Sequence, residues 1–297
     1  MTLAIRLSAV GKDYPHFVLK DIDLAVPEGQ VMGLIGPNGA GKSTTLRILM
    51  GLVHQDRGQV EVLGRAMPAE QTIAKRDVGF VSEDMRLYKS ATLAWHMAFI
   101  ASIYPEWDAK YAEVLVKRFG LRKDQKVGRL SHGERVKATL LLVLARRPRL
   151  MVLDEPTTGL DPVARHEVLS SLMEAVTDEH RTILFSSHNT TDIEQISDQI
   201  TFIDRGHIVE SGDKELFLDR WRRVRLEIEP GVALPVLPDV VSTVGSGRLS
   251  IVTTSNYDDA MSDAWRTAGA RVFAVEPMTL EEIFVARVVN SRAPEAA

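Results

Sequence analysis

The sequence has 297 residues, of which 45% are hydrophobic and 26% charged, and it carries a formal net charge of −4. This length predicts one large domain with a smaller appendage, and the composition is that of a globular chain able to bury a sizeable core. The acidic balance argues against a polyanionic partner, so no nucleic acid is expected, and the absence of cysteine excludes disulfides and thiolate metal sites.

The first part of the chain has the pattern of a sheet with one helix. Strands are expected at residues 2–10, 18–26, 31–35, 59–63 and 78–82. The run 31–35 is apolar throughout, which indicates a buried strand. A glycine-rich turn follows it, and a helix is predicted over 42–50.

The pattern becomes helical from about residue 84 to about residue 147. Helices are expected over 93–103, 109–119 and 134–145. Pro148 ends the last of them, because the residue before a proline is pushed out of the α region. The apolar stretch 91–103 is shorter than the ~18 residues that span a bilayer and contains a histidine. Any association with a membrane is therefore expected to come through a partner.

Strands and helices alternate after this helical part. Strands are expected at 150–153, 182–186, 199–203 and 207–210, and helices over 162–176 and 190–196. This alternation predicts an α/β fold with a largely parallel sheet.

A second unit is predicted from Trp221 onward. Strands are expected at 223–229, 249–253 and 271–275, and helices from about 258 and over 279–288. Thr279 and Glu282 have capping-box spacing at the start of the last helix. The expected domains are residues 1–220, with a helical subdomain at about 84–147, and a small α+β domain at 221–297.

The turn after the strand 31–35 has the sequence of a phosphate-binding loop. It reads Gly36, Pro37, Asn38, Gly39, Ala40, Gly41, Lys42, Ser43. Its glycines let consecutive backbone N–H groups turn inward and form an anion site at a helix N-terminus. Lys42 can then reach the β and γ phosphates, and Ser43 can place its hydroxyl on Mg²⁺. We expect these residues, with Thr44, to bind the nucleotide.

Two carboxylates follow the apolar strand 150–153. Asp154 stands at the strand tip, where it suits the Mg²⁺ sphere, and Glu155 suits a general base that acts on water. His188 follows the strand 182–186, at the edge where open α/β sheets bind ligands. A lone histidine is more often structural than catalytic, but a neutral imidazole here could hydrogen-bond the γ phosphate or the attacking water. Lys42, Glu155 and His188 are the candidate catalytic residues.

Residues 3–219 resemble the ATPases of ATP-binding cassette (ABC) transporters. The segments that carry the resemblance are the Walker A motif at 36–43, the signature at 130–134, the Walker B motif at 150–155, the D-loop at 159–162 and the switch histidine at 188. The resemblance implies a P-loop ATPase core, which is a mixed sheet with a helical insertion, followed here by the small α+β domain. It also implies ATP and Mg²⁺ as cofactors and ATP hydrolysis as the activity.

The same resemblance assigns residues outside the loop to the nucleotide. Tyr14 matches the aromatic residue that stacks on adenine. Ser131 and Gly133 match signature residues that contact the γ phosphate of an opposite subunit, and Asp161 matches the D-loop aspartate.

The sequence departs from the family pattern in two places. Glu83 stands where the family has glutamine, and it is expected as a third metal-site residue beside Ser43 and Asp154. In the signature, His132 replaces the first glycine and Glu134 replaces glutamine. His132 puts a ring where the backbone normally approaches nucleotide, which indicates tuned rather than lost hydrolysis.

The resemblance further implies two kinds of partner. A second copy would face the first head to tail, with two ATP molecules in the interface of a homodimer. An integral membrane permease would dock near residues 83–103 and hold the chain, otherwise cytoplasmic, on the inner face of the cell membrane. The ending 278–284 is similar to tails of exporter-type ATPases.

Two alternatives remain open from the sequence. One is a soluble ABC-type ATPase that acts on nucleic acid or ribosomes, although such relatives usually carry two cassettes or a long coiled coil. The other is a nucleotide-gated clamp that does not hydrolyse ATP, which Glu83 and His132 suggest.

Overall fold

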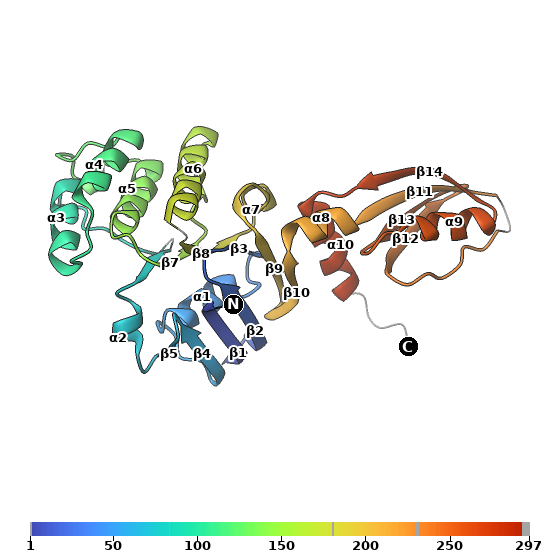
Figure 1. Ribbon diagram of the computed structural model, residues 1–297, viewed down its shortest axis with the longest axis horizontal. Coiled ribbons are helices and arrows are strands. Elements are labelled where there is room, and N and C mark those ends of the chain that lie inside the picture. Colours follow the sequence, from blue (N-terminus) through green and yellow to red (C-terminus); the bar gives the residue numbers. More distant parts are fainter. Residues whose placement is uncertain (1, 83, 180, 230–231, 293–297) are drawn as a thin grey trace. The chain divides into compact units, whose positions relative to one another are not determined.

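The computed structural model describes residues 2–82, 84–179, 181–229 and 232–292, which belong to two units (Figure 1). The units are Met1–Ile208 and Val209–Ala297. This division lies before the boundary expected after residue 220, because the intervening residues pack with the second unit. Arg287 of the last helix donates to Glu210 at 2.5 Å, and its guanidinium lies 5.8 Å from the Trp221 ring centre.

The first unit contains an antiparallel sheet and a largely parallel one. The antiparallel sheet has the order β2-β1-β4-β5, formed by β1 (Leu3–Tyr14), β2 (Phe17–Pro27), β4 (Arg57–Val62) and β5 (Arg65–Met67). The other sheet has the order β10-β9-β3-β8-β7-β6, formed by β3 (Val31–Ile35), β6 (Val78–Val81), β7 (Leu150–Asp154), β8 (Thr182–Ser187), β9 (Gln199–Asp204) and β10 (His207–Asp213). The boundary between the units falls within β10, after Ile208. The strands from β9 to β6 pair in parallel. Every residue of β3, β7 and β8 is buried, as in parallel strands covered on both faces.

One core cluster joins both sheets to helix α1 (Lys42–Leu49). Leu46 and Leu49 of α1 are fully buried among side chains that include Ile5 of β1 and Val152 of β7. Burial of a leucine side chain contributes about 1.5–3 kcal/mol. These contacts fix the helix whose first residue is Lys42.

A group of helices occupies the residues between β6 and β7. They are α3 (Leu93–Ile103), α4 (Ala109–Arg118), the 3₁₀ turn η1 (Val127–Arg129) and α5 (His132–Leu144). Thr92, Asp108 and Ser131 cap α3, α4 and α5, each accepting a backbone N–H of the first turn. Figure 1 shows these helices gathered together, with α6 (Pro162–Glu179) beside α5. The predicted helical part is confirmed.

The first unit also contains α2 (Gln71–Ala74) and α7 (Thr190–Ile196). Among the described residues, no helix combines the length and the apolar character that crossing a membrane requires.

The described residues of the second unit form a four-stranded antiparallel sheet and three helices. Its strands have the order β12-β13-β11-β14, formed by β11 (Arg222–Ile228), β12 (Val240–Ser246), β13 (Leu249–Thr254) and β14 (Ala270–Pro277). Its helices are α8 (Lys214–Arg220), α9 (Asp259–Thr267) and α10 (Leu280–Arg292). Trp265 of α9 is 1% exposed and packs with Val224 and Leu226 of β11. The predicted capping box is confirmed: Thr279 N donates to Glu282 Oε2 at 2.9 Å, and Glu282 N donates to Thr279 Oγ1 at 3.3 Å.

Candidate active site

The glycine-rich loop connects β3 to the start of α1. Gly41 precedes the helix with a φ of 112°, a left-handed conformation that favours glycine. Gly41 has no side chain to cap the helix, so the N–H groups of the first turn stay open to an anion. Gly36 lies against β9, where an added Cβ would meet the Ile203 carbonyl oxygen at 2.4 Å. The loop therefore needs glycine at both of these positions.

A cavity of about 490 Å³ lies over this loop. Its lining residues are Pro37, Asn38, Gly39, Ala40, Gly41, Lys42, Ser43, Thr44, Glu155, His16 and Phe17. All the residues expected from the loop line it except Gly36, whose carbonyl accepts from Lys42 Nζ at 2.7 Å. Glu155, from the end of β7, closes one side of the cavity.

The three candidate catalytic residues are brought together. Lys42 Nζ lies 3.1 Å from Glu155 Oε1, and His188 Nδ1 lies 2.7 Å from Glu155 Oε2. A carboxylate accepts, so the imidazole donates from Nδ1, and in a neutral ring Nε2 is then an acceptor. Lys42 is 5% exposed, whereas the His188 side chain is 48% exposed.

The charges around Glu155 set its ionisation. Burial by itself would raise the pKa of this carboxyl, but the Lys42 ammonium and the His188 ring together outweigh burial and hold the pKa below its ordinary value. Glu155 is therefore ionised at neutral pH in this arrangement.

Asp154 sits beside Glu155 and is held by two hydroxyls. Ser43 Oγ donates to Asp154 Oδ1 at 3.1 Å, and Ser186 Oγ donates to the same oxygen at 2.7 Å. The Ser186 hydroxyl also accepts from Glu155 N at 3.0 Å. Ser186 thus connects both carboxylate residues to β8, a role that no local sequence pattern predicts. The pairing of β7 with β8, which places Ser186 opposite Asp154, is the signal that could have found it.

The residue expected near adenine, Tyr14, belongs to a hairpin whose other residues reach the cavity. Tyr14 ends β1 and is 38% exposed, with its ring centre 6.4 Å from that of Phe17. Tyr14 is not among the residues that line the cavity, whereas His16 and Phe17 of the same hairpin are. Neither of these two residues is predicted by a motif of the sequence.

The signature and D-loop residues take other positions. Ser131 caps α5 in a capping box, in which its N–H donates to Glu134 Oε2 at 2.7 Å. Asp161 accepts from Val163 N at 2.9 Å and caps α6. Ser131, Gly133 and Asp161 do not line the cavity of their own chain. Glu83, expected near the metal, lies outside the described residues.

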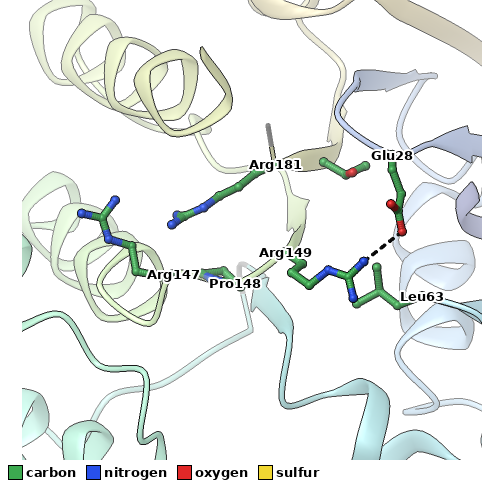
Figure 2. Close-up of a pocket in the computed structure, with 7 residues that line it drawn as sticks. Glu28, Leu63, Arg147, Pro148, Arg149 and Arg181 are labelled. Carbon is green, nitrogen blue, oxygen red and sulfur yellow. Dashed lines mark hydrogen bonds and ion pairs between the residues drawn. The ribbon is translucent and has the colours of Figure 1, made fainter. Parts of the chain in front are cut away.

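A second cavity, of about 270 Å³, lies near the residues where the parallel strands β7 and β8 begin, whereas the glycine-rich loop follows the end of β3 (Figure 2). Three arginines line it where β7 and β8 begin, and Figure 2 shows Arg149 turned toward Glu28. Arg149 donates to Glu28 at 3.1 Å, and Arg147 donates to Asp108 at 2.9 Å. These ion pairs compensate much of the positive charge, so the anion site is assigned to the glycine-rich loop.

Known proteins are similar to this chain in sequence and fold. The sequence model described as ABC transporter matches residues 19–158. The ABC transporter ATP-binding protein YtrB of Bacillus subtilis is 28% identical over 93% of this chain and 94% of its own length. The Nod factor export ATP-binding protein I of Neorhizobium galegae is 30% identical over 96% of this chain and 84% of its own length. A solved ATP-binding subunit of an ABC transporter matches with a TM-score of 0.66 at 27% identity, covering 72% of this chain and 91% of that structure.

These likenesses confirm the resemblance and the fold class stated from the sequence. The relatives match across both units, and within this chain Lys42 of the glycine-rich loop and His188 both contact Glu155. The chain belongs to the ABC transporter family, in which it is an ATP-binding and ATP-hydrolysing subunit.

Proposed function

We propose that the chain is the Mg²⁺-dependent motor of an exporter, in which two copies close on ATP and drive a separate membrane subunit. One observation carries the proposal: Lys42 and His188 converge on the two oxygens of Glu155 beside the cavity over the glycine-rich loop. In the proposed site, the open N–H groups of α1 and Lys42 hold the phosphates.

Ser43 and Asp154 fit a magnesium ion. Mg²⁺ usually binds through one or two protein oxygens and completes its shell with phosphates and water. The two side-chain oxygens lie 3.1 Å apart at the N-terminus of α1, next to the proposed phosphate site. A bound Mg²⁺ would neutralise charge on the β and γ phosphates.

Lys42 links the arrival of ATP to the basicity of Glu155. A triphosphate competes with Glu155 for the Lys42 ammonium, because the triphosphate carries several negative charges and the carboxylate carries one. Once Lys42 turns to the phosphates, Glu155 loses the ion pair that lowers its pKa. Glu155 then becomes a stronger base only when nucleotide is present. It accepts a proton from the water whose oxygen bonds to the γ phosphorus, while the bond from that phosphorus to the β–γ bridging oxygen breaks and ADP leaves.

His188 orients this reaction through Glu155. With Nδ1–H donated to Glu155, a neutral ring offers Nε2 as an acceptor. That acceptor lies on the far side of the ring from the carboxylate, out of reach of a water that also contacts Glu155. We therefore assign His188 to holding the Glu155 carboxylate through Nδ1, so that it positions the attacking water through Glu155.

Ser131, Gly133 and Asp161 are assigned to the site of a second copy. They do not line the cavity of their own chain, which supports a homodimer in which each signature loop covers the other copy's ATP. ATP would then favour the closed pair, because the γ phosphate gains contacts only there, and hydrolysis would release it.

Exposed aromatic side chains on α3 and in the loop before it support a docking site for the membrane subunit. Tyr88, Trp95 and Phe99 are 65%, 45% and 42% exposed. The Trp95 and Phe99 rings stack at 5.1 Å, and Tyr88 meets Trp95 edge-on at 5.6 Å. Exposed aromatic clusters of this kind are typical of interfaces. A partner bound here would hold the chain on the inner face of the cell membrane.

Two features favour export over import. The relative from Neorhizobium galegae is named for Nod factor export, and the ending 278–284 is similar to exporter tails. The cargo would be chosen by the membrane subunit.

The substitution Glu155→Gln tests the proposed site. It keeps the size of the side chain and removes its charge, so ATP binding should remain while steady-state phosphate release falls about 10²–10⁴-fold. The ATP-bound variant should also accumulate as a dimer in light scattering. Glu61→Gln, which alters a half-exposed carboxylate on β4, is the matched control and should keep wild-type turnover.

Two results would contradict the proposal. Wild-type turnover by Glu155→Gln would show that Glu155 is not the base. A wild-type chain that binds ATP without releasing phosphate would favour the nucleotide-gated clamp.

A further inference from the structure

The histidine of the signature loop (residues 130–134) makes a bond to another loop of its own chain. His132 Nε2 lies 3.0 Å from the main-chain carbonyl oxygen of Thr158. Because a carbonyl oxygen only accepts, Nε2 carries the proton and donates. The ring fits here because Gly159 has no side chain: a Cβ on Gly159 would lie 3.0 Å from Nε2.

Thr158 connects this bond to the carboxylate that acts on water. Its hydroxyl donates to Glu155 Oε2 at 3.0 Å, the same oxygen that accepts from His188. Its main-chain N–H donates to the Glu155 carbonyl at 3.2 Å, which closes a tight turn over residues 155–158. The carbonyl of Thr158 is held by His132 and its hydroxyl bonds to Glu155, so displacement of the ring would displace the carboxylate.

A separate ion pair keeps the two helices together. Lys137 of α5 and Glu167 of α6 lie 3.0 Å apart, with side chains 14% and 32% exposed. This pair does not involve the turn over residues 155–158. Removal of the His132 bond would therefore free the turn while α5 stays beside α6.

We propose that His132 is a positioning residue: its ring holds Thr158 and thereby aligns the Glu155 carboxylate with the attacking water in the same chain. The inference rests on the proposed role of Glu155. A glycine at position 132, as in the usual signature, has no side chain that could make this bond. The residue that departs from the family pattern thus acts on the hydrolytic step rather than on nucleotide binding.

Substitutions at His132 in the full chain test the proposal. His132→Leu removes the donor and keeps much of the volume, and it should lower kcat for ATP hydrolysis about two- to tenfold, the range given by one neutral hydrogen bond. The KM for ATP should change by less than about twofold, because the glycine-rich loop holds the phosphates and the signature residues assigned to the other copy's ATP are Ser131 and Gly133, not His132. His132→Gln, which places an amide donor at similar reach, should restore kcat to near the wild-type value. A purely structural role would instead lower Tm and leave the leucine and glutamine variants alike.

A double-mutant cycle with Thr158→Val tests the route through Thr158. This variant lacks the hydroxyl that bonds to Glu155, so adding His132→Leu should lower kcat no further. Effects that multiply would overturn the route through Thr158. Wild-type kcat in His132→Leu would overturn the inference and leave the role of Glu155 intact, whereas wild-type kcat in Glu155→Gln would overturn both.

Discussion

Substitution of Ser186 by alanine should destabilise the nucleotide-free first unit. Ser186 is fully buried, and its hydroxyl donates to Asp154 at 2.7 Å while accepting from Glu155 N at 3.0 Å. A hydrogen bond to a charged group contributes about 1.5–3 kcal/mol. The second bond adds less, because Glu155 N also donates to the Ser186 carbonyl at 3.2 Å. The free energy of unfolding should therefore fall by about 1.5–3 kcal/mol.

Thermal unfolding followed by circular dichroism measures this loss. For a unit of this size, each kcal/mol corresponds to about 2–4 °C, so Ser186→Ala should lower the Tm by about 3–12 °C. The matched control is Ser170→Ala on α6, where the serine hydroxyl is exposed and only approaches His166 at 3.5 Å. Equal Tm values for the two variants would refute the reasoning, because they would show that the buried hydroxyl does not stabilise Asp154.

Gly36→Ala should lower both Tm and ATP affinity, because its Cβ would meet the Ile203 carbonyl oxygen at 2.4 Å; unfolding and nucleotide titrations that match wild type would contradict this close approach. As pH falls, the free energy of unfolding of the wild-type protein should decrease more steeply than that of the Glu155→Gln variant. Although burial opposes it, Lys42 and His188 hold the pKa of Glu155 below the ordinary 4.5, so ionised Glu155 stabilises the fold above the unfolded pKa. That stabilisation is lost as pH falls through the lower folded value, and parallel unfolding curves for the two proteins below about pH 4.5 would argue against it.

The central strands and the glycine-rich loop could be predicted because their signals are local. The apolar runs at 31–35 and 150–153 became β3 and β7, and the glycines before Lys42 became the turn into α1. In each case neighbouring residues alone specify the conformation.

Other features depend on contacts between distant residues. Ser186 meets Asp154 only because β7 and β8 pair in one register. Strand β12 was missed because it is an edge strand whose residues 242–246 are exposed, so they show no apolar alternation. Helix α8 was missed because it is short and joins the second unit through packing rather than through a pattern of its own.

The backbone of Glu155 adds a further constraint on the site. Its φ of 52° lies in the left-handed region, which costs a non-glycine residue about 1–3 kcal/mol and persists only where surrounding contacts enforce it. Here the enforcing contact is Ser186, which accepts the Glu155 N–H, while Thr158 and His188 hold the side chain.

The two carboxylate oxygens of Glu155 have different partners. Oε2 accepts from Thr158 and His188, which fix the direction of the carboxylate. Oε1 faces Lys42, whose ammonium lowers the pKa of the Glu155 carboxyl against the opposing effect of burial. In the proposed mechanism, a triphosphate that takes Lys42 removes only the contact at Oε1. Glu155, as the proposed base, then keeps its direction while its basicity rises, so one ligand would activate the carboxylate without a rearrangement that would misplace it.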